Sequence, residues 1–206
     1  MIDLTNEIDA LLQKLFPIGR SITGDGNRET LMALQEHIPL RIIEYPSGMK
    51  VHDWVIPKEW RIRAGVIKDQ NGKVLIDYRN SNLHVVSYSV PVHRQMTFDE
   101  LRKKLFFLEE KPDSIPYRTT YYNLDWGFCL TFNDYKENFS GKETESFEVI
   151  IDSELFDGSL SVGELLIPGR SEKEILLSTY ICHPSLANDN LSGVVLTCLL
   201  AKELLK

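Results

Sequence analysis

Residues 176–193 read LLSTYICHPSLANDNLSG and combine an apolar run, a polar turn and the start of a helix. The apolar run from Glu174 to Ile181 predicts a strand buried on both faces, and residues 190–206 predict a helix with one apolar face. His183 and Asp189 lie between these two elements. Neutral imidazole and carboxylate are both zinc ligands, and a strand end followed by a helix start can hold them in a fixed relation. The pattern predicts an α/β sheet that carries part of a metal site.

The composition is typical of a globular protein and argues against several classes of partner. The chain has 206 residues, of which 43% are hydrophobic, and a formal net charge of −7. No segment concentrates Lys and Arg, so we expect no nucleic-acid partner. The apolar runs are strand-sized and the N-terminus lacks a signal-peptide pattern, so we expect neither a membrane span nor export. The three cysteines form no CxxC pair, which fits a reducing compartment and predicts a cytoplasmic location.

Changes in sequence pattern along the chain predict three segments. Residues 1–45 contain two helix patterns and a strand and form the first part of an α/β domain. Residues 46–116 consist of short β patterns separated by turn signals and form a β-rich inserted domain. Residues 117–206 continue the α/β domain. The predicted fold is an α/β domain interrupted by a β-rich one.

Two local signals in the β-rich segment predict particular structures. Asn71 and Gly72 stand between two apolar runs, a pattern typical of a hairpin turn. Thr97 and Glu100 have the spacing of a capping box and predict the start of a short helix.

The residues around the predicted metal site also carry a family resemblance. Asp189, followed at the family's spacing by Ser192 and Gly193, resembles the zinc-dependent aminopeptidase and carboxypeptidase superfamily. More narrowly, the chain resembles bacterial aminopeptidase-like proteins that are often linked to surface-polysaccharide gene clusters. The motifs that carry this narrower resemblance are CHPS (182–185), ANDNLSG (187–193), KVHDWVIPKEW (50–60), NLHVVSYS (82–89) and IPYRTTYY (115–122). The resemblance runs from about Ala10 to the C-terminus.

The resemblance implies a fold and a set of metal ligands. It implies a zinc-aminopeptidase-like mixed sheet with flanking helices, incomplete in this chain and interrupted by the β-rich domain. His183 would be a terminal ligand on one metal, and Asp189 would be the carboxylate that bridges two ions. The implied cofactor is therefore zinc, as one or two ions.

The resemblance also implies a reaction, metal-assisted hydrolysis of a peptide bond or of an amide of an amino sugar. The family's general-base Glu and its remaining carboxylate and His ligands have no counterpart after Asp189, so we expect them beyond residue 206. The chain is accordingly expected to be the N-terminal portion of a longer protein. Whether it acts as a homo-oligomer is left open.

Each candidate residue has an alternative interpretation. Asp189 could be the N-cap of the final helix, and His183 could be a hydrogen-bonded structural residue. His52 and Arg20 are candidates for substrate binding, although His52 is more simply a structural or exposed residue and Arg20 part of a folding turn. Cys182 adjoins His183, but neighbours on a strand point to opposite faces, so we expect a buried structural thiol rather than a Cys/His pair.

Two other classes of function compete with a zinc hydrolase. The residue two positions after the family's His is an Asp that orients the imidazole, whereas this chain has Ser185 there. That difference favours a non-catalytic binding or scaffold protein that keeps the fold. A third alternative is a partner-binding module built on the β-rich domain.

Overall fold

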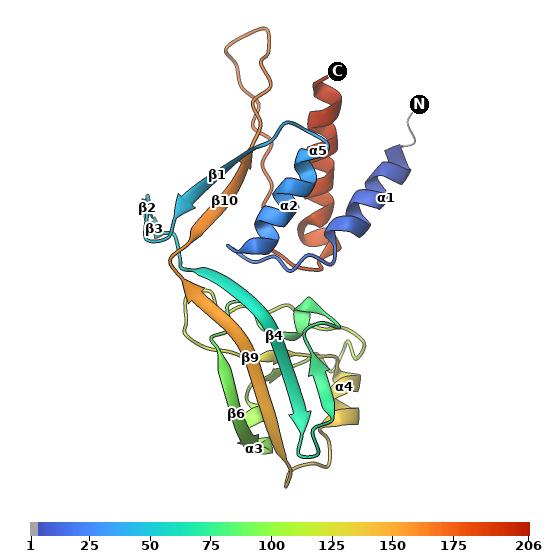
Figure 1. Ribbon diagram of the computed structural model, residues 1–206. Coiled ribbons are helices and arrows are strands. Elements are labelled where there is room, and N and C mark those ends of the chain that lie inside the picture. Colours follow the sequence, from blue (N-terminus) through green and yellow to red (C-terminus); the bar gives the residue numbers. More distant parts are fainter. Residues whose placement is uncertain (1–3) are drawn as a thin grey trace. The chain divides into compact units, whose positions relative to one another are not determined.

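The computed structural model describes residues 4–206 and shows a mixed α/β chain with several small sheets (Figure 1). The chain forms two compact units. Unit 1 comprises Met1–Glu59 and Asp157–Lys206, and unit 2 comprises Trp60–Phe156. In sequence, unit 2 therefore lies between the two parts of unit 1. Residues 1–3 of the predicted first segment lie outside the described residues.

Three helices of unit 1 pack through one apolar cluster, and their spacing of apolar residues predicted them. They are α1 (Leu4–Leu15), α2 (Asp25–Gln35) and α5 (Ser192–Leu204). The buried members of the cluster are Leu11, Leu15, Ile18, Leu31, Ala33, Leu34, Ile38, Leu191, Val194, Val195, Cys198 and Leu199. No helix in residues 4–206 is long and apolar enough to cross a membrane.

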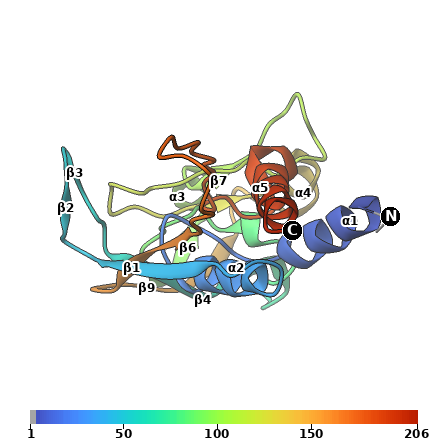
Figure 2. The ribbon, with the colours of Figure 1, turned by 90° about the horizontal axis from the view of Figure 1, so that it is seen from above.

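The strands of unit 1 form two small antiparallel pairs. Strand β1 (Arg41–Pro46) pairs with β10 (Ser159–Glu164), in a register that places Arg41 opposite Glu164. Strands β2 (Lys50–Val51) and β3 (Trp54–Val55) form a short hairpin, which projects from the end of the β1–β10 pair in Figure 2.

Unit 2 is built around a four-stranded sheet with the order β5-β4-β9-β6. Its other elements are two short helices, a 3-10 turn and a parallel strand pair. The bounds are β4 (Glu59–Asp69), β5 (Val74–Asp77), η1 (Asn82–His84), β6 (Val92–Thr97), α3 (Phe98–Arg102), β7 (Leu105–Phe106), β8 (Phe128–Cys129), α4 (Phe132–Asn138) and β9 (Ser146–Phe156). The unit has its own core, in which Phe128, Phe139 and Phe147 are fully buried.

Both local predictions for unit 2 are confirmed. Strands β4 and β5 form an antiparallel hairpin, and Gly72 in its turn has a φ of 81°, which favours glycine. Thr97 and Glu100 form a capping box at the start of α3.

The boundaries of unit 2, at Trp60 and Phe156, differ from the predicted domain boundaries at residues 46 and 116. Strand β1 pairs with β10, and this pairing holds the segment that follows β1 in unit 1 as far as Glu59. Strands β4 and β9 are neighbours in one sheet, and this keeps the chain in unit 2 as far as Phe156. Both pairings join residues far apart in sequence, so composition did not reveal them.

The predicted strand from Glu174 to Ile181 is not formed, and that prediction is wrong for the described residues. From the end of β10 to residue 186 the chain is an irregular loop (Figure 1), in which Ile175 is 91% exposed and Leu176 is 87% exposed. A strand requires hydrogen-bonding partners along its edges. Within residues 4–206 no strand pairs with this segment, so Ile175, Leu176 and Leu177 remain exposed, whereas Ile181 packs against the helical core cluster.

Candidate metal centre

The two predicted ligands, His183 and Asp189, meet in the loop that leads into α5. The His183 Nδ1 atom lies 3.6 Å from Asp189 Oδ1. The imidazole is largely buried, with 19% of the side chain exposed, whereas 60% of the Asp189 side chain is exposed. The loop thus presents a nitrogen donor and an oxygen donor side by side.

Asp189 is not the N-cap of the final helix, so that alternative interpretation is wrong. The N-cap of α5 is Leu191, and no side chain caps the helix. A kinked turn, η2 (Ala187–Leu191), precedes α5, and Asp189 has a non-helical φ of −122° and ψ of 84° within it. The carboxylate is therefore not engaged by the first amides of the helix.

Tyr180 joins the two candidate ligands, and the sequence reasoning missed it. Its hydroxyl donates a hydrogen bond to Asp189 Oδ1, and its ring lies edge-on to the His183 ring with centroids 5.2 Å apart. The hydrogen bond to Asp189 is the largest cause of a raised pKa of the Tyr180 phenol. The phenol therefore stays protonated at neutral pH and fixes one carboxylate oxygen. Its place just before His183 in the sequence was the only signal of this role.

The loop is tied to the segment that follows α1 by two hydrogen bonds. Arg20 Nε donates to the His183 carbonyl at 3.1 Å, and Ser185 Oγ donates to the Phe16 carbonyl at 3.1 Å. Ser185 has a φ of 46°, in the left-handed region. Its hydroxyl thus holds the loop, and its hydrogen bond goes to a backbone carbonyl rather than to the imidazole.

The expectation that Cys182 and His183 point to opposite sides is wrong. Cys182 Sγ lies 3.9 Å from His183 Nδ1, because the segment is a loop and the alternation of a strand does not apply. Burial is the main cause of a raised pKa of the Cys182 thiol. A protonated thiol is a poor nucleophile, so this contact does not make an activated Cys/His pair.

The donor chemistry of the pair fits zinc, but two donors do not complete a site. Structural and catalytic zinc is typically four-coordinate. In the described part of the chain, no three His, Cys, Asp or Glu side chains form a group that could hold a metal. Further donors would have to come from outside these residues.

Of the two candidates for substrate binding, His52 lies away from the donor pair, whereas Arg20 contacts the backbone of His183. His52 is exposed, has a φ of 54° and occupies the turn between β2 and β3. Figures 1 and 2 both place this hairpin on the far side of the β1–β10 pair from α5. Arg20 is only 2% exposed and binds backbone carbonyls. Their roles in substrate binding remain predictions.

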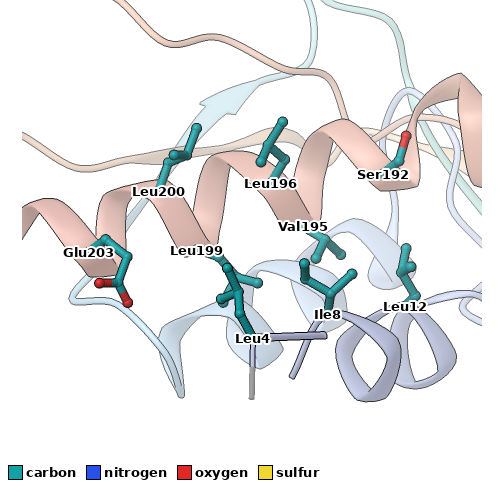
Figure 3. Close-up of a pocket in the computed structure, with 9 residues that line it drawn as sticks. All are labelled: Leu4, Ile8, Leu12, Ser192, Val195, Leu196, Leu199, Leu200 and Glu203. Carbon is teal, nitrogen blue, oxygen red and sulfur yellow. The ribbon is translucent and has the colours of Figure 1, made fainter. Parts of the chain in front are cut away.

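An apolar groove between α1 and α5 is separate from the candidate metal centre (Figure 3). It is lined by Leu4, Ile8, Leu12, Ser192, Val195, Leu196, Leu199, Leu200 and Glu203. Neither His183 nor Asp189 lines it, and Glu203 is its one ionisable lining residue. Hydrolytic chemistry therefore does not belong to this groove.

The fold is that of a peptidase-like mixed α/β protein. A crystal structure from Clostridium acetobutylicum, described as that of a "putative peptidase", matches with a TM-score of 0.94 and 50% sequence identity. The match covers 98% of this chain and 47% of that one. The chain belongs to the family described as "Domain of unknown function (DUF4910)", which matches residues 9–206.

A curated relative carries a more specific description. It is a Clostridium acetobutylicum protein named "Putative polysaccharide biosynthesis protein with aminopeptidase-like domain", 52% identical over 200 residues. The match covers 97% of this chain and 45% of that protein. The chain thus spans about half the length of the relatives it matches. The narrower resemblance seen in the sequence agrees with this name, whereas the resemblance to the zinc superfamily remains a prediction.

Proposed function

We propose that this chain forms part of a peptidase-like hydrolase and supplies His183 and Asp189 as zinc ligands. The observation that carries the proposal is the approach of His183 Nδ1 to within 3.6 Å of Asp189 Oδ1 at the start of α5. Bound zinc lowers the pKa of a coordinated water and polarises a carbonyl group. Tyr180 orients the Asp189 carboxylate, while Ser185 and Arg20 hold the loop that carries the imidazole.

The remaining metal donors and the general base are proposed to lie in the part of the protein that corresponds to the rest of its relatives. The chain covers 45% of the curated relative, so there is room in such a protein for several further strands and loops. The proposed substrate is a peptide or an amide of an amino sugar. The second choice draws its support from the words "polysaccharide biosynthesis" in the relative's name. A cytoplasmic location, with no nucleic-acid or membrane partner, remains part of the proposal.

A non-catalytic scaffold is the second candidate, and Ser185 is the observation that favours it. The family's orienting Asp is replaced by a hydroxyl that donates to the Phe16 carbonyl. An imidazole that lacks its outer-shell carboxylate binds metal more weakly, by roughly 10- to 100-fold in known sites. A scaffold would keep the loop and bind no zinc.

Zinc binding by the full-length protein, expressed without a histidine tag, separates the two candidates. The variants are His183→Ala and Asp189→Ala, and His52→Ala is the matched control because it removes an exposed histidine from the same unit. The proposal expects the first two to lose more affinity than the roughly 10- to 100-fold cost of losing an outer-shell group. The control should bind as the wild type does. A folded wild type that binds no zinc would contradict the hydrolase proposal and favour the non-catalytic scaffold.

A zinc-loaded wild type then goes into a hydrolysis screen. Aminoacyl amides and N-acylated amino sugars represent the two proposed substrate classes. Turnover that is lost in both His183→Ala and Asp189→Ala would support a hydrolase. Zinc binding without turnover of either class would contradict the proposed substrates.

A further inference from the structure

We propose that Arg20 is a positioning residue that fixes the His183 backbone by joining it to the C-terminal end of α1. The expected effect of Arg20 on metal affinity rests on the proposed zinc function, whereas its expected effect on the position of the loop does not. The composition of the turn around Arg20 does not distinguish it from an ordinary folding turn. The contacts of the Arg20 guanidinium make that distinction.

The guanidinium of Arg20 bridges two backbone carbonyls that are far apart in sequence. Its Nε donates to the His183 carbonyl at 3.1 Å, and its Nη1 donates to the Leu15 carbonyl at 2.6 Å. Leu15 is the last residue of α1 and is fully buried. The final carbonyls of a helix lack partners within the helix and carry partial negative charge, so a cation is favoured there. Arg20 thus links the helix end directly to the ligand's own backbone.

The placement of Arg20 is costly if packing is its only role. Arg20 is 2% exposed, and in residues 4–206 the partners of its guanidinium are the two backbone carbonyls rather than a carboxylate. Its Nη2 atom is buried and has no hydrogen-bond partner in the described part of the chain. Burial lowers the pKa of the guanidinium to about 10, so it remains charged at neutral pH. Burying a charge of this kind is costly unless its environment compensates, whereas an apolar side chain would fill the same space without that cost.

The base of the Arg20 side chain is itself held rigidly on α2. The Asn27 side chain accepts a hydrogen bond from the Ser21 amide at 3.2 Å and donates one to the Ser21 carbonyl at 2.8 Å. A Cβ atom on Gly26 would lie 2.1 Å from the Gly19 carbonyl oxygen, so the turn packs directly on the first turn of the helix. Because its origin is fixed, the guanidinium can set the position of His183 rather than follow it.

The Ser185 hydrogen bond to the Phe16 carbonyl supports the same assignment. It ties a second point of the loop to the residue that follows α1. With Ser185 in this structural role, Arg20 supplies a second anchor on the other side of Pro184. The imidazole is then positioned through its backbone.

The test compares Arg20→Met and Arg20→Lys with Arg28→Met in the full-length protein. Arg28→Met is the matched control, since Arg28 is a partly buried arginine of the same unit whose partners are Asp25, Glu44, Glu59 and Ser159. Lysine keeps the charge but lacks the planar fork that reaches two carbonyls together. It also covers the case in which the Met variant fails to fold.

Two readouts distinguish a positioning role from a merely structural one. The first is the His183 Cε1–H resonance in histidine-labelled, metal-free protein, assigned by its loss in His183→Ala. The second is zinc affinity. We expect both Arg20 variants to broaden or split the resonance and to weaken zinc binding by roughly 10- to 100-fold, the effect of losing an outer-shell partner. Arg28→Met should lower thermal stability and leave both readouts at their wild-type values.

The outcomes separate the inference from the proposed function. Folded Arg20 variants with a wild-type resonance and wild-type zinc affinity would overturn the inference. A changed resonance in a protein whose wild type binds no zinc would support the positioning of the loop and overturn the zinc function. Equal changes in the Arg20 and Arg28 variants would reduce Arg20 to a structural residue and overturn the inference.

Discussion

Replacement of Glu59 by Gln is expected to destabilise unit 1, because Glu59 is a buried carboxylate held by Arg28. The Glu59 side chain is 2% exposed. Its two oxygens accept hydrogen bonds from Arg28 Nη1 at 2.6 Å and Nη2 at 2.8 Å, and one of them also accepts the Ser159 amide at 2.9 Å. Gln keeps the shape but loses the charge, and its NH2 group would face one of these donors.

The contacts of Arg28 set the size of the expected loss. Removing one partner of a buried ion pair costs about 3–5 kcal/mol. Arg28 is 28% exposed, and its Nε also binds Glu44 Oε1 at 3.1 Å, so it regains some hydration and keeps a carboxylate partner. We therefore expect Glu59→Gln to lower the free energy of unfolding by about 3 kcal/mol, at the lower end of that range.

Urea unfolding followed by circular dichroism measures this loss, and its pH dependence gives a second check. Burial raises the pKa of Glu59, but the hydrogen bonds from Arg28 and Ser159 together lower it by more than burial raises it. The net pKa therefore lies below the ordinary value. The stabilisation is therefore complete above the ordinary pKa of a glutamate and is lost as the pH falls through the lower folded-state value. The difference between wild type and variant should shrink on acidification.

A surface variant provides the control for Glu59→Gln. Glu154 pairs with Arg63 at 2.7 Å, but both side chains are about half exposed, so Glu154→Gln should leave stability nearly unchanged. If Glu59→Gln unfolds within about 0.5 kcal/mol of the wild type, as an ordinary surface substitution does, the reasoning about the buried pair is refuted.

Three further substitutions test the site and the fold. Tyr180→Phe keeps the ring contact with His183 and removes the hydrogen bond to Asp189, so zinc titration should show an affinity roughly 10-fold weaker; an unchanged affinity would count against the orienting role. Cys182→Ser should bind zinc as the wild type does, since the thiol is assigned no metal, and a large loss would make it a ligand. Thr131→Ala should cost about 1 kcal/mol in urea unfolding, because it removes the capping box at the start of α4.

Patterns among neighbouring residues were sufficient to predict the helices, one hairpin turn and one helix cap. The apolar spacing of α1, α2 and α5 was sufficient, because each helix buries one face in the same cluster. The hairpin at Gly72 and the capping box at Thr97 depend on a few neighbouring residues and were also predicted. The capping box at Thr131 follows the same rule, with Asp134 in the place of Glu, and was overlooked.

Features that depend on distant partners could not be predicted in this way. The pairing of β1 with β10 and the neighbouring positions of β4 and β9 fix the limits of the two units. The apolar run from Glu174 to Ile181 has the composition of a buried strand, but a strand also needs partners, and residues 4–206 provide none.

In the candidate metal centre, too, one contact between residues close in sequence was predicted and a contact between distant residues was not. His183 and Asp189 are close in sequence, and their meeting was predicted from the turn that separates them. The hydrogen bond from Arg20 to the His183 carbonyl joins opposite ends of the chain, so no local pattern indicated it. The contact between Cys182 and His183 was missed because alternation was assumed for a segment that is not a strand.

Zinc-edge anomalous diffraction from crystals of the full-length protein grown with zinc tests the central claim most directly, because it locates the metal. We expect an anomalous peak about 2.0–2.2 Å from a His183 ring nitrogen and an Asp189 carboxylate oxygen, the usual zinc ligand distances. A peak held by other residues, or no peak beside His183 and Asp189 in a zinc-containing crystal, would contradict it.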